Sequence, residues 1–541
     1  MNALDEVLTP GEQLTYVSSI GGKPFSYHWT LYAGDVHSAD PPARLHRLIF
    51  LTETLPSAVG LGGPPVRIRA NLLCHANLSP SRYRVETKTS VNLFVAGEES
   101  HIILPDGSRH QVEDEEYHCI IGENLGQLAL FLRLARDEVR DGFTARFFSL
   151  GGVSAFDYTL SSLPRDAGDS PRGRWFAGPF MDELLLDEEG WLARHEIPKE
   201  GVVSKREELP LPDWWDKSLR EEPLVYMPPA GASFTLLDVQ VPGPVVSIGT
   251  TVTVPKGEGP HPVAIFLSGS GSHDRHGMDG QLDLGSHELV DFLSEHGWLC
   301  ARFDTRGTGT TKVGEDFLEF GIDEIVADAR AVLRYVAALA SADASRLALV
   351  GHSQGGLVAL ELALVEEDVR GMALLAAAAR PVGEVLRDQI AVRGRWLRQT
   401  EEQVQTQVED LEEFLRLVRA VGEWTPENVP PKFYVLKRQR KWYADLLERD
   451  PLKLIARAPC PVLICQGAKD FQVSLEKDAE ALYRTASLAG VPVELAVFQN
   501  LDHLFKPVEG ESHIAQYYDQ GRGVADELKR RVLDFLDTHV R

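Results

Sequence analysis

The sequence predicts an α/β fold with a mostly parallel sheet in the C-terminal part of the chain, preceded by an N-terminal β-rich domain. From Phe234 onward, short apolar segments alternate with amphipathic helical segments, which is typical of a parallel sheet covered by helices on both faces. Up to about residue 198 the pattern is mostly strand-like, with turn residues between the segments. The length of 541 residues exceeds what one hydrophobic core usually serves, so two domains are expected.

The elements of the α/β part are predicted from local periodicity and segment length. Short apolar runs indicate buried strands, and longer amphipathic segments indicate helices. The predicted strands are 263–267, 299–303, 347–350, 372–376, 462–465 and 493–498. The predicted helices are 288–296, 323–339, 357–364 and 524–536.

The N-terminal domain, residues 1–198, is predicted to be mostly antiparallel β structure with one helix. Alternating segments such as 83–95, 101–121 and 184–197 indicate half-buried strands separated by turns. The helical pattern covers 125–139. The sequence shows no internal repeat, which argues against a solenoid or a propeller.

Two segments fit neither pattern. Residues 199–233 are rich in proline and charge and contain Trp214 and Trp215, so we predict a linker or a wrapping arm whose tryptophans pack on something. Residues 380–459 interrupt the α/β domain, 234–541, with an insertion too long for a plain connection. The insertion has apolar residues at helical spacing and many aromatic side chains. It is either a helical excursion with a small core of its own or a lid that walls the substrate pocket.

Composition restricts the class of protein. Hydrophobic residues at 43% and charged residues at 25% are typical of a globular protein. The formal net charge of -25 argues against a nucleic-acid partner, because phosphate binding needs clustered lysine and arginine. We expect no secretion signal and no membrane span, since the sequence shows no apolar run of that length. The five scattered cysteines suggest reduced thiols, and hence a cytoplasmic protein.

The segment 351–356, with the sequence GHSQGG, lies directly after one predicted strand and directly before a predicted helix. A serine hydroxyl is a poor nucleophile, and it becomes reactive where a sharp turn lifts it out of the sheet within reach of a base. Gly351 and Gly355, two positions to either side, allow the backbone to make that turn. The pattern therefore predicts an α/β-hydrolase fold with Ser353 as its nucleophile.

In this fold the acid and then the histidine follow the serine along the chain. Asp470 follows the strand 462–465 and His503 follows the strand 493–498, so both should lie at one edge of the sheet with Ser353. His503 would take the proton from the serine, and Asp470 would hold the imidazole tautomer and stabilise its charged form. Weaker candidates for the acid are Asp478, Glu480 and Asp502.

The oxyanion that forms during acyl transfer needs two preorganised hydrogen-bond donors. One predicted donor is the backbone N–H of Gln354, directly after the nucleophile. The other should come from the glycine-rich loop after the strand 263–267, where Ser270 is the best candidate. This loop ends at the same predicted edge of the sheet.

Two further clusters are interpreted as structural. Asp304 and Arg306 flank a glycine-rich turn after the next strand and are expected to tie it down. His273 and His276 are three positions apart, but no other ligands stand at suitable spacing, so no metal is expected.

Together, these motifs resemble the EstD-type carboxylesterases, a bacterial branch of the α/β-hydrolase superfamily close to the dienelactone-hydrolase-like group. The resemblance covers about residues 234–541. It rests on GSG at 269–271 with DR at 274–275, DxRGxG at 304–309, GHSQGG at 351–356, PVL at 461–463 leading to GxxD at 467–470, and HLF at 503–505. It implies hydrolysis of carboxylic esters, often with short acyl groups, by Ser353, Asp470 and His503 without a cofactor.

The sequence departs from the family pattern in one loop. Ser268 stands where many α/β-hydrolases have a histidine. Ser272 and His276 replace a proline and an acidic residue that are common in this branch. All three positions lie in the loop expected to supply Ser270 to the oxyanion hole, so its detailed shape is left open.

The leading hypothesis is a serine carboxylesterase that cleaves small-molecule esters through an acyl-enzyme intermediate. A thioesterase or acyltransferase would use the same triad, although a chain of net charge -25 has no evident attraction for the phosphates of coenzyme A. A non-catalytic binding protein on a hydrolase scaffold would have no reason to keep serine, aspartate and histidine together. The sequence leaves the oligomeric state open, including a homo-oligomer.

Overall fold

The computed structural model divides the chain into two compact units. The first comprises Met1–Glu222 and Arg393–Arg438, and the second comprises Pro223–Val392 and Gln439–Arg541. The structure describes residues 4–39, 42–56, 65–75, 78, 80–87, 91–95, 101–103, 109–111, 119–121, 124–149, 154–164, 173–217, 219, 224–280, 282–313, 319–396, 399–420, 422–425, 428–434, 436–519 and 521–541. Turns such as the predicted one at 105–107 lie outside these residues.

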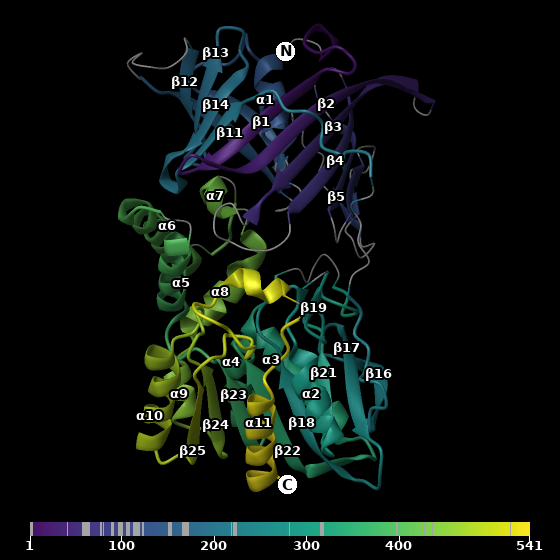
Figure 1. Ribbon diagram of the computed structural model, residues 1–541, viewed down its shortest axis with the longest axis vertical. Helices are drawn as coiled ribbons and strands as arrows, with labels where there is room; N and C mark the ends of the chain where they lie inside the picture. The colour runs from purple at the N-terminus through teal and green to yellow at the C-terminus, as the bar shows by residue number, and fades with distance from the viewer. Residues whose placement is uncertain are drawn as a thin grey trace. The chain divides into compact units, whose positions relative to one another are not determined.

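The first unit is built on a 15-stranded sheet with the order β8-β7-β6-β5-β4-β3-β2-β1-β15-β14-β13-β12-β11-β10-β9 (Figure 1). Neighbouring strands run antiparallel except β9 and β10, which are parallel. The strands are β1 Gln13–Ile20, β2 Lys23–Ala39, β3 Pro42–Thr54, β4 Val66–Cys74, β5 Pro80–Thr87, β6 Val91–Val95, β7 His101–Ile103, β8 Arg109–Gln111, β9 Cys119–Ile121, β10 Phe143–Ser149, β11 Ser154–Ser162, β12 Gly173–Ala177, β13 Glu183–Asp187, β14 Leu192–Ile197 and β15 Val202–Arg206. The predicted N-terminal β-rich region is confirmed.

One face of this sheet buries the helix α1, Leu125–Leu134. Asn124 caps the helix, since its side chain accepts a hydrogen bond from the N–H of Gly126 at 2.9 Å. The helix ends earlier than the predicted 125–139, because the chain turns after Ala135. Val139 nevertheless stays buried in the same core, which is why the apolar pattern continued to it.

The structure groups part of the predicted insertion 380–459 with the first unit. Helices α6, Glu401–Ala420, and α7, Pro431–Tyr434, belong to it. Lys432 pairs with Asp410 at 3.1 Å and with Glu413 at 3.2 Å, which joins the two helices. The ring of Phe414 in α6 also packs against the rings of Trp424 and Phe433.

The second unit contains an eight-stranded sheet with the order β16-β17-β21-β18-β22-β23-β24-β25. The strands are β16 Phe234–Pro242, β17 Ser247–Pro255, β18 His261–Leu267, β21 Leu299–Phe303, β22 Ala342–His352, β23 Val369–Leu375, β24 Val462–Gly467 and β25 Val493–Phe498. The pairs β16–β17 and β17–β21 are antiparallel, and the following pairs from β21 to β25 are parallel. A separate two-stranded sheet joins β19, Met278–Asp279, to β20, Leu282–Asp283.

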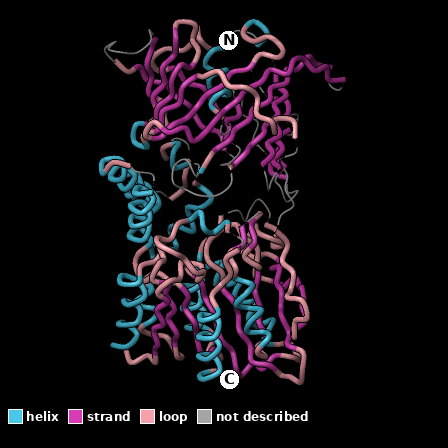
Figure 2. The backbone as a smooth tube through the Cα atoms, viewed as in Figure 1, coloured by secondary structure: helices cyan, strands magenta, loops and turns pink. Residues whose placement is uncertain are grey.

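Helices cover both faces of this sheet, as Figures 1 and 2 show. The helices that pack on the sheet are α2 Ser286–Glu295, α3 Ile322–Ala337, α4 Gln354–Val365, α9 Pro451–Ile455, α10 Glu480–Leu488 and α11 Asp526–His539. The unit also holds α8 Arg440–Glu448 and most of α5 Val382–Trp396, which continues past the unit boundary at Val392. In β18, Val263 and Ile265 pack into the core shared with α3 and α4, whereas Ala264 and Phe266 pack into the core shared with α2 and α11. Alternate strand residues thus serve opposite layers, which explains why the strands are apolar throughout.

The parallel strands end at one edge of the sheet. In the register of β18 and β22, Leu267 lies beside Gly351, and in that of β24 and β25, Gly467 lies beside Phe498. The loops after these strands therefore meet at the carboxyl edge. Within the part of the chain that the structure describes, no helix is long and apolar enough to cross a membrane.

Candidate active site

Ser353 lies on a tight turn between β22 and α4. Its backbone has φ 53° and ψ -119°, a left-handed conformation that costs energy for a residue with a side chain. The residues two positions before and after Ser353 have no room for a side chain. A Cβ on Gly351 would collide with the backbone of Gly355, and one on Gly355 would collide with the backbone of Leu267. The tightness of the turn itself therefore explains Gly351, and the packing of the turn against β18 explains Gly355.

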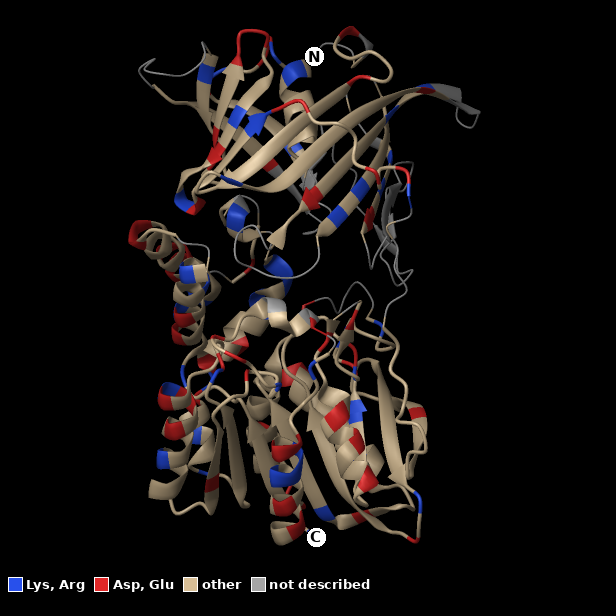
Figure 3. Cartoon of the chain, in the orientation of Figure 1, with Lys and Arg blue, Asp and Glu red and all other residues tan. Residues whose placement is uncertain are grey.

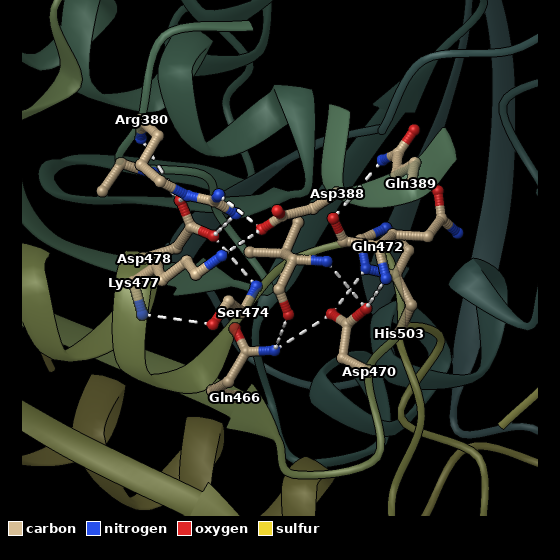
Figure 4. Close-up of polar contacts among 12 residues, drawn as sticks. Arg380, Asp388, Gln389, Gln466, Asp470, Gln472, Ser474, Lys477, Asp478 and His503 are labelled. Carbon is tan, nitrogen blue, oxygen red and sulfur yellow. Dashed lines mark hydrogen bonds and ion pairs between the residues drawn. The ribbon is translucent and has the colours of Figure 1, made fainter. Parts of the chain in front are cut away.

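Asp470 and His503 are in direct contact (Figure 4). The Nδ1–H of His503 donates to Asp470 Oδ2 at 2.7 Å, and the exposed fractions of the two side chains are 5% and 0%. The other oxygen of Asp470 accepts hydrogen bonds from the N–H groups of Gln472 at 2.7 Å and Val473 at 3.0 Å. This arrangement fixes the tautomer of His503 and leaves its Nε2 as a proton acceptor.

Gln466 also holds Asp470, and the sequence analysis missed it. Its Nε2 donates to Asp470 Oδ2 at 3.0 Å and to the carbonyl of Val473 at 3.2 Å (Figure 4). The residue is fully buried at the end of β24. A polar side chain in an otherwise apolar strand was the signal that could have found it.

We expect Gln466→Met to lower kcat by roughly 5- to 20-fold, the effect of losing one hydrogen bond to a charged group. KM should stay within about twofold, because Gln466 does not line the cavity described below. Steady-state kinetics on a p-nitrophenyl ester, with a melting curve for each protein, would measure this. A purely structural role would instead lower the fraction of active enzyme and the melting temperature with an unchanged turnover per folded molecule.

His352 connects the serine turn to the histidine loop. Its Nε2–H donates to the carbonyl oxygen of His503 at 2.9 Å, and the two ring centroids lie 4.9 Å apart. Burial lowers the pKa of His352 to about 3, so its ring is neutral and can serve as this donor. The neighbour of Ser353 thus holds the backbone of His503. No hydrogen bond joins the Ser353 and His503 side chains among the described contacts.

The weaker candidates for the acid have other partners. Asp502 is fully buried and pairs with Arg522 at 2.5 Å. Asp478 is fully buried too, and both its oxygens bind the guanidinium of Arg380, at 3.0 and 2.8 Å (Figure 4). Glu480 is half exposed, with 45% of its side chain accessible, and lies near Arg484. None of the three contacts a ring nitrogen of His503 among the described contacts.

The loop after β18 lies against the serine turn. A Cβ placed on Gly269 would lie 3.2 Å from the Cβ of Ser353. Ser270, Ser353 and Gln354 line one cavity. The structure thus brings the two predicted oxyanion donors and the predicted nucleophile to the same space.

Two residues in which this loop departs from the family pattern, Ser272 and His276, have partners in the structure. Ser272 donates to Asp279 at 2.6 Å. The His276 ring stacks on Tyr226 at 4.3 Å, and its Nδ1 accepts from Arg302 at 3.0 Å. Burial lowers the pKa of His276 to about 3. Among the described residues, no group of three or more histidine, cysteine, aspartate or glutamate side chains could hold a metal ion.

The glycine-rich turn after β21 is held by its acidic residue. Asp304 accepts hydrogen bonds from the N–H groups of Arg275 and Thr310, each at 2.7 Å. Arg306 pairs with Asp328 through two hydrogen bonds, at 2.7 and 2.9 Å. These contacts attach the turn to the neighbouring loop and to α3.

The cavity beside Ser353 has a volume of about 180 Å³. Its walls are mainly apolar and come from α5, α8 and the loop after β24. Trp442 of α8 donates from Nε1 to the side-chain oxygen of Gln354 at 2.8 Å, which joins this wall to the residue after the serine. The lining side chains from α5 and α8 are Val382, Val385, Leu386, Gln389, Trp442 and Leu446.

Comparisons with known proteins bear on the family of the chain. Residues 275–506 match the family model of the serine aminopeptidases, S33. Esterase EstD of Thermotoga maritima is 30% identical over 301 residues, which cover 55% of this chain and 67% of that protein. A sheet covered on both faces, with a serine on a strand-to-helix turn at its carboxyl edge, defines an α/β-hydrolase. The chain belongs to the EstD-type carboxylesterases and is accordingly a hydrolase.

Similar solved structures include an esterase of Pyrococcus furiosus, Pf2001, at 16% identity and a TM-score of 0.40, over 59% of this chain and 96% of that chain. Another is Est1E of Butyrivibrio proteoclasticus with bound ferulic acid, at 16% identity and a TM-score of 0.36, over 56% and 99%. At these scores the family assignment rests on the sequence relative.

Proposed function

We propose that this protein hydrolyses carboxylic esters through an acyl-enzyme intermediate formed on Ser353. The observation that carries the proposal is the buried hydrogen bond from His503 to Asp470, at the sheet edge where a strained turn presents Ser353. His503 takes the proton from Ser353 as its oxygen attacks the ester carbonyl, and then gives a proton to the leaving alcohol. Water repeats the sequence on the acyl-enzyme and releases the acid.

Asp470 stabilises the imidazolium that forms in each step. Backbone N–H groups and Gln466 donate hydrogen bonds to its oxygens, which holds the carboxylate beside the ring of His503. The N–H groups of Gln354 and Ser270 would stabilise the oxyanion, which is supported by their position on the same cavity as Ser353. The mechanism requires the Ser353 hydroxyl and Nε2 of His503 to be in hydrogen-bond contact when substrate is bound.

We further propose that α5 and α8 are the lid of the cavity. The support is that apolar side chains from both helices line it, and that Trp442 contacts Gln354. Helices α6 and α7, which the sequence analysis included in the lid, group with the first unit and have no part in this proposal. The domain boundaries at residues 198 and 233 and the cytoplasmic location stay predictions.

The size of the cavity predicts a preference for short acyl groups. A volume of about 180 Å³ is below the roughly 300–1,000 Å³ of pockets that hold drug-sized ligands, which suits an acyl chain of a few carbons. We expect kcat/KM for p-nitrophenyl esters to peak at the butyrate or hexanoate and to fall at least about tenfold by the laurate. A chain-length series measured at one pH tests this.

The same series should include acyl-CoA thioesters of matched length. If the thioester were turned over much faster than any oxygen ester, the proposed function would change from esterase to thioesterase. Binding without any turnover would indicate a non-catalytic protein on this scaffold.

A further inference from the structure

The first unit has a second polar site, on the face of its sheet opposite to α1. Side chains of β3, β4 and β5 form rows across this face. Arg47, Leu73 and Arg82 stand in one row, and Ile49, Asn71 and Arg84 stand in the next. The third row holds Leu51, Arg69 and Glu86. In Figure 3, blue marks Lys and Arg positions on these neighbouring strands.

The third row is closed by contacts within the unit. Arg69 pairs with Glu86 at 2.8 Å and donates to the carbonyl of Lys217 at 2.7 Å. Lys217 follows Trp214, which is 4% exposed and packs against Trp29 of β2. The tryptophan-containing arm therefore covers this end of the face. Arg69 and Glu86 neutralise each other's charge by pairing.

The first two rows keep an excess of positive charge. Arg47 reaches the amide oxygen of Asn71 at 3.2 Å, and no ion pair joins Arg47, Arg82 or Arg84 to a carboxylate among the described residues. Arg82 and Arg84 stand two positions apart on β5 and so share one face with Arg47, which lies on the other side of β4. Their accumulation in a chain of net charge -25 is unusual and favours an anionic ligand.

These rows line a cavity of about 670 Å³. Arginines are not its whole lining, since Val36, Ile49, Leu73 and Trp215 add apolar surface. Its two carboxylates are Glu86, already paired with Arg69, and the exposed Asp216. The cavity thus combines planar guanidinium donors with an apolar wall.

We propose that this cavity binds an organic carboxylate with an apolar body, the chemical class of acid that ester hydrolysis releases. Guanidinium groups bind carboxylates through paired hydrogen bonds, and the apolar side chains would cover the rest of the molecule. Inorganic phosphate would match the charge but leave the apolar wall unused. The choice of a carboxylate rests on the proposed esterase function, whereas the site itself contains none of the catalytic residues.

Octanoate titrated into the full-length chain by calorimetry tests the proposal. We expect octanoate to bind more tightly than octan-1-ol or inorganic phosphate, and more weakly as salt screens the arginines. The double variant Arg82→Gln with Arg84→Gln should lower octanoate affinity at least about tenfold. Its kcat and KM for a short p-nitrophenyl ester should remain those of the unmodified enzyme.

A matched double variant, Arg136→Gln with Arg140→Gln, removes two exposed arginines outside the cavity and should keep the affinity. Melting curves of both variants report folding. Equal octanoate affinity in the Arg82/Arg84 variant and the unmodified enzyme would overturn the site, as would equally tight binding of octan-1-ol or phosphate. Octanoate that binds at the catalytic cavity alone would act as a competitive inhibitor and be insensitive to these variants. Esterase assays report separately on the proposed function.

Discussion

Ser353→Ala is expected to lower kcat for a short p-nitrophenyl ester by about 10⁵- to 10⁶-fold, with KM changed by about threefold or less. The hydroxyl is the group that would form the acyl-enzyme, while the cavity and its oxyanion donors remain. A fluorophosphonate probe should label the unmodified enzyme at one serine and leave the variant unlabelled, as mass spectrometry would show. The control is Ser345→Ala, an exposed serine on β22, the strand that precedes the Ser353 turn, whose hydroxyl donates a hydrogen bond to Asp343.

The backbone at Ser353 provides a second test of the same residue. Ser353→Gly should be as inactive as the alanine variant, because it too lacks the hydroxyl. It should melt at a higher temperature than the alanine variant, because glycine adopts φ 53° without the strain that a residue with a side chain has there. Retention of more than about 1% of the activity in either variant would mean that the nucleophile is another residue.

Asp470→Asn is expected to lower kcat by about 10³- to 10⁴-fold. An amide can donate to Nδ1 of His503 and thereby favour the wrong tautomer, and it cannot stabilise the imidazolium. The asparagine side chain has the size of the aspartate and can still accept hydrogen bonds from the N–H groups of Gln472 and Val473, so folding should be preserved. Steady-state kinetics with melting curves separate the two effects.

The competing acids provide the controls for this prediction. Asp502→Asn removes the carboxylate charge that pairs with the mostly buried Arg522, and Asp478→Asn leaves Arg380 with Asp388 as its remaining carboxylate partner. Each should lower the free energy of unfolding by about 3 kcal/mol, while kcat of the folded protein falls by about tenfold or less. A larger loss of turnover in either variant than in Asp470→Asn would transfer the role of the acid to that residue.

The secondary structure of the second unit was largely predictable. The strands 299–303 and 493–498 have the predicted bounds, and the other predicted elements differ mainly at their ends, whereas β16, β17 and α10 were not among the predicted elements. Buried parallel strands are continuous apolar runs, so they stand out in the sequence without knowledge of their neighbours. The turn at Ser353 was predictable for a related reason, since its two glycines are required by the local backbone.

Features that depend on distant contacts were not predictable in this way. Gln466 looks like an ordinary residue at the end of a strand, and its role depends on a loop four residues later folding back onto it. The division of residues 380–459 between the two units could not be predicted from the sequence either. Helical periodicity shows that one face of a helix is apolar, but it does not show which surface packs against that face.

The sequence by itself determined the elements of this protein, the family of its second unit and the order of its candidate catalytic residues, because each depends on local periodicity or on short motifs. Tertiary structure alone decided the partners: His503 with Asp470 and Asp478 with Arg380, as well as the placement of arginines from three strands on one face of a sheet. Pairing between strands and loops depends on register and packing across long stretches of chain, and no local pattern encodes it.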